Sequence, residues 1–112
     1  MAKNNNFLFK IDLLLLSVLR ESDKYAYEMV KEIAKMTDNT IIPKQGTIYP
    51  VIHKLIDKEY VSSTDVVVNN KIRVYYHIEE KGLAYLESIT NDYDNLVQCI
   101  DLIVHGTKHH QR

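Results

Sequence analysis

The chain has 112 residues, a formal net charge of -1 and 46% hydrophobic residues, which indicates one small globular domain and excludes a disordered chain or a polycation. Its single cysteine, Cys99, excludes an intramolecular disulfide and a cysteine zinc site. The apolar run from Phe7 to Leu19 is too short to span a bilayer and lacks the cleavage site of a signal peptide, so we expect a soluble cytoplasmic protein with no membrane partner.

We expect residues 1–6 to be a disordered lead before the first predicted helix, at residues 7–20. This helix is apolar nearly all round, which is typical of a helix covered on several sides by its own fold or by a second subunit. Ser22 and Asp23 end it and can cap the next helix. The apolar side chains of that second helix recur at helical spacing, at Ala26, Val30, Ile33 and Ala34.

Asp38 and Asn39 end the second helix, and Ile41 with Ile42 predicts a brief strand before Pro43.

A third helix follows, and its two faces differ in chemistry. Pro50 lacks an N–H group and is tolerated only near a helix start, so this helix begins between Gln45 and Thr47. The apolar face consists of Ile48, Val51, Ile52 and Leu55. The opposite face has hydroxyls, an aromatic ring, an imidazole and one cation. Its residues are Thr47, Tyr49, Pro50, His53 and Lys54. Such a face suits a negatively charged, hydrogen-bonding partner, and a DNA groove is the leading candidate.

Residues 61–68 and 72–78 predict a β-hairpin, because both are rich in β-branched residues. Asn69 and Asn70 lie between them and tolerate the positive φ of a tight turn. Lys71 and Arg73 then lie near the tip of the hairpin. Alternation places Tyr76 in the core and Tyr75 on the other face, where it contacts a phosphate or braces the third helix.

Residues 80–105 predict a long final helix with a heptad stripe of apolar side chains, which buries against another helix. The stripe consists of Leu86, Ile89, Tyr93, Leu96, Ile100 and Ile103. Between Lys81 and Lys108 the helix has acidic residues but no Lys or Arg, so it should lie away from DNA.

Two further features of this helix have simple interpretations. Cys99 is expected to be a buried structural thiol, since no basic neighbour in sequence would lower its pKa. His105, His109 and His110 lie at a helix end and in a terminal tail beyond Gly106, where a defined site is rare, so we expect no metal.

The element order predicts a mainly α fold with a small β-hairpin, a winged helix-turn-helix domain followed by a dimerisation helix. The domain would cover residues 7–78, the dimerisation helix residues 79–106, and a flexible tail residues 107–112. No phosphate-binding glycine loop, paired carboxylates or nucleophile–base signature is present, so we expect no enzyme activity and no cofactor.

Three stretches of the chain resemble the PadR family of bacterial transcriptional regulators, in its short form with a single C-terminal helix. The segment from Gln45 to Leu55 is similar to the recognition helix of the family. Residues 73–76 with Glu80-Lys81-Gly82 are similar to the return strand of the wing and the entry to the last helix. Residues 25–28 resemble the start of the second helix. The similarity extends from about Ile11 to Ile103.

The resemblance implies a homodimer, joined mainly through the last helix, that binds double-stranded DNA at a palindromic operator. It also implies repression until a small hydrophobic or aromatic effector, or a stress signal, releases the DNA.

The sequence departs from the family pattern at several positions. Ala26 and Glu59 stand where glycines are usual, so either Glu59 adopts the left-handed conformation or the turn differs. Glu79 replaces a Thr cap. The wing has few cations.

Three sets of candidate site residues follow from these predictions. The DNA-binding set is Lys44, Gln45, Thr47, Tyr49, His53, Lys54, Lys71, Arg73 and Tyr75. The dimer-interface set is the heptad stripe, in which Tyr93 is either an interface aromatic or a ring that stacks on a ligand. The effector-pocket set is Phe9, Leu13, Tyr93, Leu96 and Ile100. The alternative function is a winged-helix protein-interaction module without DNA binding, which the sparse wing favours.

Overall fold

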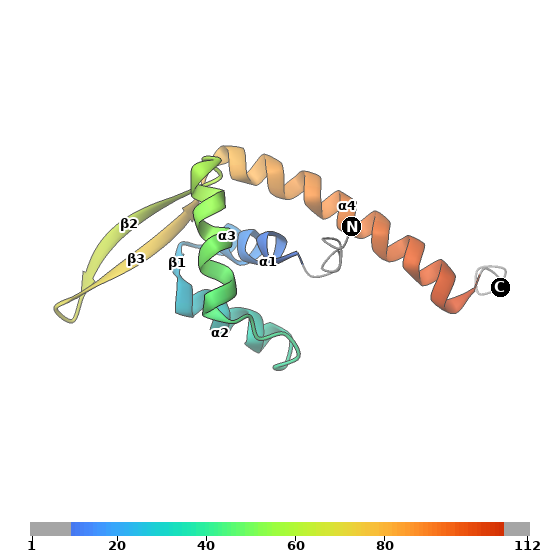
Figure 1. Cartoon of the computed structure of the whole chain (residues 1–112), viewed down its shortest axis with the longest axis horizontal. Helices are drawn as coiled ribbons and strands as arrows, with labels where there is room; N and C mark the ends of the chain where they lie inside the picture. The colour runs from blue at the N-terminus through green and yellow to red at the C-terminus, as the bar shows by residue number, and fades with distance from the viewer. Residues whose placement is uncertain (1–9, 107–112) are drawn as a thin grey trace.

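The computed structural model describes residues 10–106, which form four helices and a three-stranded sheet. The fold is the expected winged helix-turn-helix arrangement: the hairpin projects at one end of the molecule and the last helix at the other (Figure 1). The elements in chain order are α1 (Ile11–Glu21), β1 (Lys24–Tyr25), α2 (Ala26–Met36), α3 (Gln45–Asp57), β2 (Val61–Val68), β3 (Lys71–Ile78) and α4 (Glu80–His105).

The core lies where the first three helices meet the base of the sheet and the start of α4. Its largest fully buried side chains come from α1, α2 and α3 and are Leu15, Leu16, Leu19, Met29, Ile48 and Ile52. α1 packs on the other helices and on β3, so it occupies the centre of the domain, as its apolar sequence predicts.

Two local predictions between the helices are wrong. The N-cap of α2 is Tyr25, so Ser22 and Asp23 do not cap it; the backbone N–H of Tyr25 donates to the Glu28 carboxylate at 3.2 Å instead. Ile41 and Ile42 form no strand, since they lie in an irregular connection to α3. In this connection the Thr37 hydroxyl accepts a hydrogen bond from the backbone N–H of Ile41 at 3.0 Å.

Lys24, the first residue of β1, is a buried cation whose ammonium group lies at the C-terminal end of α1. Its ammonium group donates to the carbonyl oxygen of Val18 at 3.0 Å and to the Ser22 hydroxyl at 2.9 Å. A cation at a helix C-terminus is favourable, because the last carbonyl groups of the helix lack partners within it.

The sheet has the order β1-β3-β2, and all its pairs are antiparallel. The hairpin is regular from Val61 opposite Ile78 to Val68 opposite Lys71. Asn69 and Asn70 form its turn with φ values of 53° and 65°, which confirms the predicted turn. β1 was not predicted, since two residues form a strand here only by pairing with β3.

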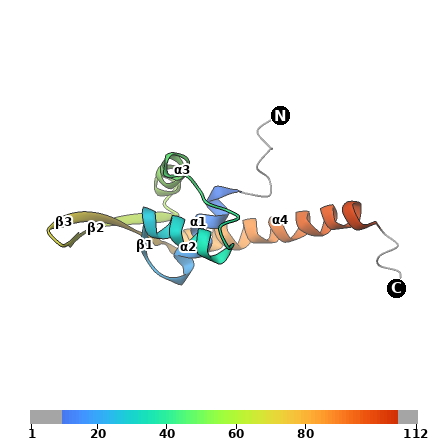
Figure 2. The same cartoon turned by 90° about the horizontal axis from the view of Figure 1, so that it is seen from below.

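α4 begins at Glu80 and ends at His105, which confirms the predicted range. Its first turn lies so close to the loop between α3 and β2 that a Cβ on Gly82 would be 2.2 Å from the carbonyl oxygen of Tyr60. The helix then passes α1 and extends beyond the rest of the fold (Figure 2). Among residues 10–106, no helix is both long and apolar enough to cross a membrane.

Candidate nucleic-acid interface

The buried face of α3 fixes which side chains of this helix reach solvent. Ile48, Ile52 and Leu55 are at most 4% exposed, so they anchor the helix on the core. Polar positions predicted for DNA contact are exposed, namely Lys44, Gln45, Thr47, Tyr49, His53 and Lys54. Lys44 is the N-cap residue, so it lies at the start of the helix. α3 therefore presents a polar, cationic outer surface with no acidic residue before Asp57.

This outer surface has two flanks. Tyr49 lies on the flank next to the hairpin, close to Tyr76. Burial raises the pKa of Tyr76, and the charge of Tyr49 adds to this rise. Thr47 and Lys54 lie on the other flank and line a cleft shared with the start of α1. The predicted DNA-binding side chains of α3 thus divide between two sides of one helix.

The hairpin places its two cations on the face opposite the core. Alternate residues of a strand share a face, so Lys71, Arg73 and Tyr75 lie on one side of β3 and the buried Tyr76 lies on the other. The guanidinium carbon of Arg73 lies 4.4 Å from the ring centroid of Tyr25. The rings of Tyr25 and Tyr75 meet edge to face, with centroids 5.4 Å apart. Tyr75 therefore packs on Tyr25, and Arg73 is held in a cation–π contact.

An exposed ion pair fixes the base of the hairpin to the turn after α1. His77 Nδ1 lies 2.7 Å from a carboxylate oxygen of Asp23. The hydrogen bond to Asp23 raises the pKa of His77, its small burial opposes this, and the charges of Asp23 and Glu79 add to the rise. Protonation of His77 thus strengthens the connection between β3 and this turn.

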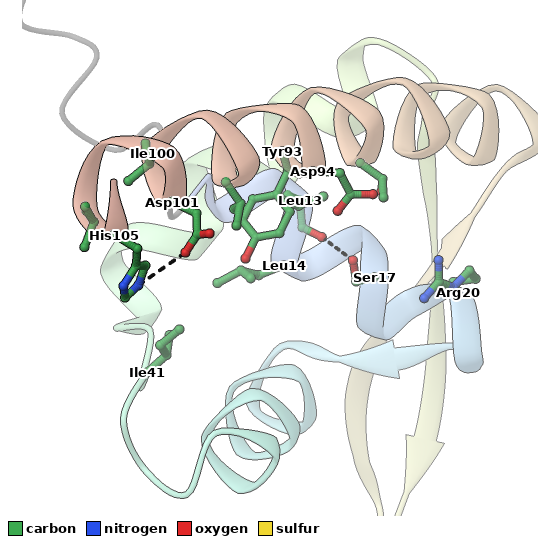
Figure 3. A pocket seen from close by; sticks show the side chains of 13 residues that line it. Leu13, Leu14, Ser17, Arg20, Ile41, Tyr93, Asp94, Ile100, Asp101 and His105 are labelled. Carbon is green, nitrogen blue, oxygen red and sulfur yellow. Dashed lines mark hydrogen bonds and ion pairs between the residues drawn. The ribbon is translucent and has the colours of Figure 1, made fainter. Parts of the chain in front are cut away.

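A groove of about 640 Å³ lies between α1 and the far part of α4, by which we mean residues 90–105. Leu13, Tyr93 and Ile100 from the predicted effector pocket line it, and Leu96 is not among its lining residues. Phe9 lies outside the described residues. In Figure 3 the Tyr93 ring extends from α4 toward α1, with Asp94 and Asp101 close by.

The heptad stripe is buried at its start and exposed at its end. Leu86 and Ile89 belong to the core, whereas Tyr93 is 38% and Ile103 is 81% exposed. Cys99 is exposed in the single chain, so its predicted burial is wrong for this chain alone. His105 pairs with Asp101 at 3.3 Å, while His109 and His110 lie outside the described residues. No cluster of His, Cys, Asp or Glu suited to a metal occurs within residues 10–106.

Sequence reasoning did not select two lysines that the structure places beside α3. Lys10 immediately precedes α1 and Lys58 immediately follows α3, and both line the cleft that contains Thr47 and Lys54. Helical spacing relates Lys58 to Lys54 and would have indicated it. Lys10 belongs to a different element, so only the tertiary structure brings it to this site.

Comparisons with known proteins agree with this geometry. The sequence model of the transcriptional regulator PadR-like family matches residues 15–88. A transcriptional regulator from Clostridium thermocellum has a similar structure, with a TM-score of 0.77, 30% identity, and coverage of 81% of this chain and 89% of that one. A PadR family transcriptional regulator from Eggerthella lenta has a TM-score of 0.73, 28% identity, and coverage of 84% and 80%.

A protein of unassigned function from Lysinibacillus sphaericus is also similar in sequence. It is 34% identical over 98 residues, which are 86% of this chain and 89% of that protein.

Proposed function

Because the chain belongs to the PadR-like family of transcriptional regulators, we propose that it acts as a dimeric repressor that binds a palindromic operator. The observation that carries this proposal is the exposed outer surface of α3, which is polar and cationic although the whole chain has a net charge of -1. Local positive charge on a helix anchored by its opposite face suits the major groove of DNA.

The far part of α4 supports a dimer. Several apolar side chains there are exposed, and the largest exposures are 81% for Ile103 and 67% for Val104. A contiguous apolar surface on one side of a projecting helix is costly in water, and a second copy of the same helix would cover it. Two copies would also present two α3 helices, so weak half-site binding would combine into specific operator binding.

The groove between α1 and α4 supports release by a small molecule. Seven of its thirteen lining residues are apolar or aromatic, which suits a small hydrophobic ligand, and the other six are polar or charged. It also lies next to the exposed apolar part of α4, so a ligand there would contact the proposed dimer interface. A bound ligand that changed the angle between the two copies would change the spacing of the two α3 helices.

A gel shift with the DNA upstream of the chain's own gene tests the proposal. The slope of log affinity against log salt should be about -5 to -10 if roughly 6–10 phosphates are neutralised. A scrambled duplex of equal length should bind more weakly. A complex that shows neither salt dependence nor sequence preference would refute DNA regulation by this chain.

One observation favours the alternative, a protein-interaction module. Val67 and Ile72 lie opposite each other near the hairpin tip and are 71% and 66% exposed, while Arg73 is engaged by Tyr25. An apolar tip can contact another protein. The same gel shift separates the two functions, since such a module would give no salt-dependent complex with DNA.

A further inference from the structure

The cleft beside α3 combines residues from three parts of the chain. It has a volume of about 390 Å³ and lies between the start of α1, the flank of α3 away from the hairpin, and the first turns of α4. We call it the lysine cleft, after Lys10, Lys54 and Lys58, which line it together with Thr47, Tyr60 and Tyr85.

The lysine cleft is positively charged. Its three lysines are exposed, and none forms an ion pair with another residue of the described part of the chain. Of the residues lining the cleft only Asp12 is acidic, and its carboxylate is already engaged. It accepts the N–H of Leu13 at 2.8 Å and the hydroxyl of Tyr85 at 2.7 Å. The lysine ammonium groups therefore remain available to an external anion.

The wall of the cleft is held in place by aromatic packing. The rings of Tyr60 and Tyr85 are stacked, with centroids 4.5 Å apart and an angle of 13° between their planes. Burial raises the pKa of Tyr85, and its hydrogen bond to Asp12 raises it further, so the phenol stays protonated and remains a donor. These contacts join the starts of α4 and α1, so they fix the position of Lys10 relative to α3.

We propose that the lysine cleft binds a backbone phosphate of the operator DNA. A helix in the major groove has one sugar–phosphate strand on each side. The hairpin and Tyr49 lie on one side of α3, and the lysine cleft lies on the other. This inference rests on the proposed DNA-binding function, and it adds Lys10 and Lys58 to the interface.

The chemistry of the cleft suits a phosphate. Lysine binds phosphate as a point charge, and three lysines with the Thr47 hydroxyl provide several donors toward one anion. The contact would carry no sequence information. It would set the orientation of α3 in the groove, because phosphate contacts fix register while base contacts specify sequence.

Two variants measure this contribution. Lys10→Gln with Lys58→Gln removes two charges but leaves Lys54 and the outer surface of α3 intact. Lys35→Gln is the matched control, since Lys35 is an exposed lysine of α2 outside the cleft. Operator binding is measured by fluorescence anisotropy at several salt concentrations, and circular dichroism verifies folding. The double variant should lose affinity on the order of 10- to 100-fold near 0.1 M salt, and its salt slope should flatten by about 1 per protomer.

A neutral phosphate provides the sharper test. Operator duplexes are prepared with a single methylphosphonate at successive positions. At one position per half-site, the neutral phosphate should weaken binding of the wild-type chain but leave the affinity of the double variant unchanged. Such non-additivity identifies the phosphate that the lysines contact. If every position weakens both proteins equally, or the double variant keeps the wild-type salt slope, the cleft does not bind DNA.

Two further outcomes are informative. If inorganic phosphate at millimolar concentration saturates the cleft and leaves DNA affinity unchanged, the site is for a small anion and the DNA assignment is wrong. If the wild-type chain binds no DNA specifically, the proposed function fails first. An unchanged salt slope in the double variant, with specific binding intact, refutes only the role of the lysine cleft.

Discussion

The two parts of α4 carry the same apolar spacing but have different surroundings. In the near part, residues 80–89, Leu86 is 2% and Ile89 is 8% exposed, because they belong to the core where α4 packs on α1. In the far part, residues 90–105, Ile103 is 81% exposed although it continues the same stripe. The comparison teaches that a heptad pattern specifies which side of a helix is to be covered, but not by which chain.

The largest expected effect comes from the near part. Leu86→Ala should lower the free energy of unfolding by about 2–5 kcal/mol, because it leaves a cavity in the core. Ile103→Ala in the far part is the comparison, since Ile103 belongs to the same stripe and is 81% exposed. Urea denaturation at two protein concentrations distinguishes them. The Leu86 loss should be independent of concentration, and the Ile103 loss should depend on it. Equal behaviour of the two would remove the distinction between the parts.

Ile100→Asp tests whether a second copy covers the far part. An unpaired charge in an interface is costly, so the dimer dissociation constant should rise at least about 100-fold. Sedimentation velocity measures it, and circular dichroism should show an intact fold. A dimer that persisted in this variant would mean that the far part of α4 is not the main interface.

Gly82→Ala examines how closely the near part approaches the domain. The added Cβ would lie 2.2 Å from the carbonyl oxygen of Tyr60, so the backbone must shift, at a cost of about 1–3 kcal/mol. Gly46→Ala in α3 is the control, because nothing lies within 4 Å of its Cβ position. Thermal unfolding of both variants should show a lower Tm only for Gly82→Ala.

Tyr85→Phe removes a single hydrogen bond between the near part and α1. The loss should be about 1 kcal/mol, since the hydroxyl donates to Asp12 at 2.7 Å. Tyr93→Phe is the far-part control and should change stability by less than about 0.5 kcal/mol, because no hydrogen bond of this hydroxyl occurs among the described residues. Chemical denaturation of both variants would reveal a reversed order if the assignment were wrong.

The smallest expected effect is a pH dependence of stability from the pair of His77 and Asp23, which lies at the end of β3 before the near part. The pKa of His77 is raised by Asp23, so its contribution to stability is complete below about pH 6.5, the unfolded value. It is lost as the pH rises through the higher folded value. The pair is exposed, so the Tm should fall by only about 1–3 °C from this cause. Asp23→Asn should abolish most of this change in calorimetry at pH 6 and pH 8.

Most of the fold could be predicted from the sequence, because its signals are local. The range of α4 and the asparagine turn follow from periodicity and backbone preference. Glu59 has a φ of 66°, one of the two alternatives expected where a glycine is usual. β1 was missed because two residues carry no period, and Ile41 with Ile42 lacked a strand with which to pair.

The candidate site was harder to predict, because its parts meet only in the folded chain. The polar face of α3 follows from helical spacing. The contact of Arg73 with Tyr25 depends on β1, which no sequence pattern indicated. Lys10 reaches the lysine cleft only because α1 passes beside α3. Tertiary neighbours of this kind lie outside the range of periodicity and spacing.

The exposed thiol of Cys99 has a practical consequence. It is the only cysteine in the sequence, and it lies in the far part of α4, beside the apolar stripe. A fluorophore attached there would occupy one known position per chain without any engineered residue. Its emission would report the joining and separation of the two copies of the proposed dimer, so the chain already contains an attachment point for measuring its own assembly.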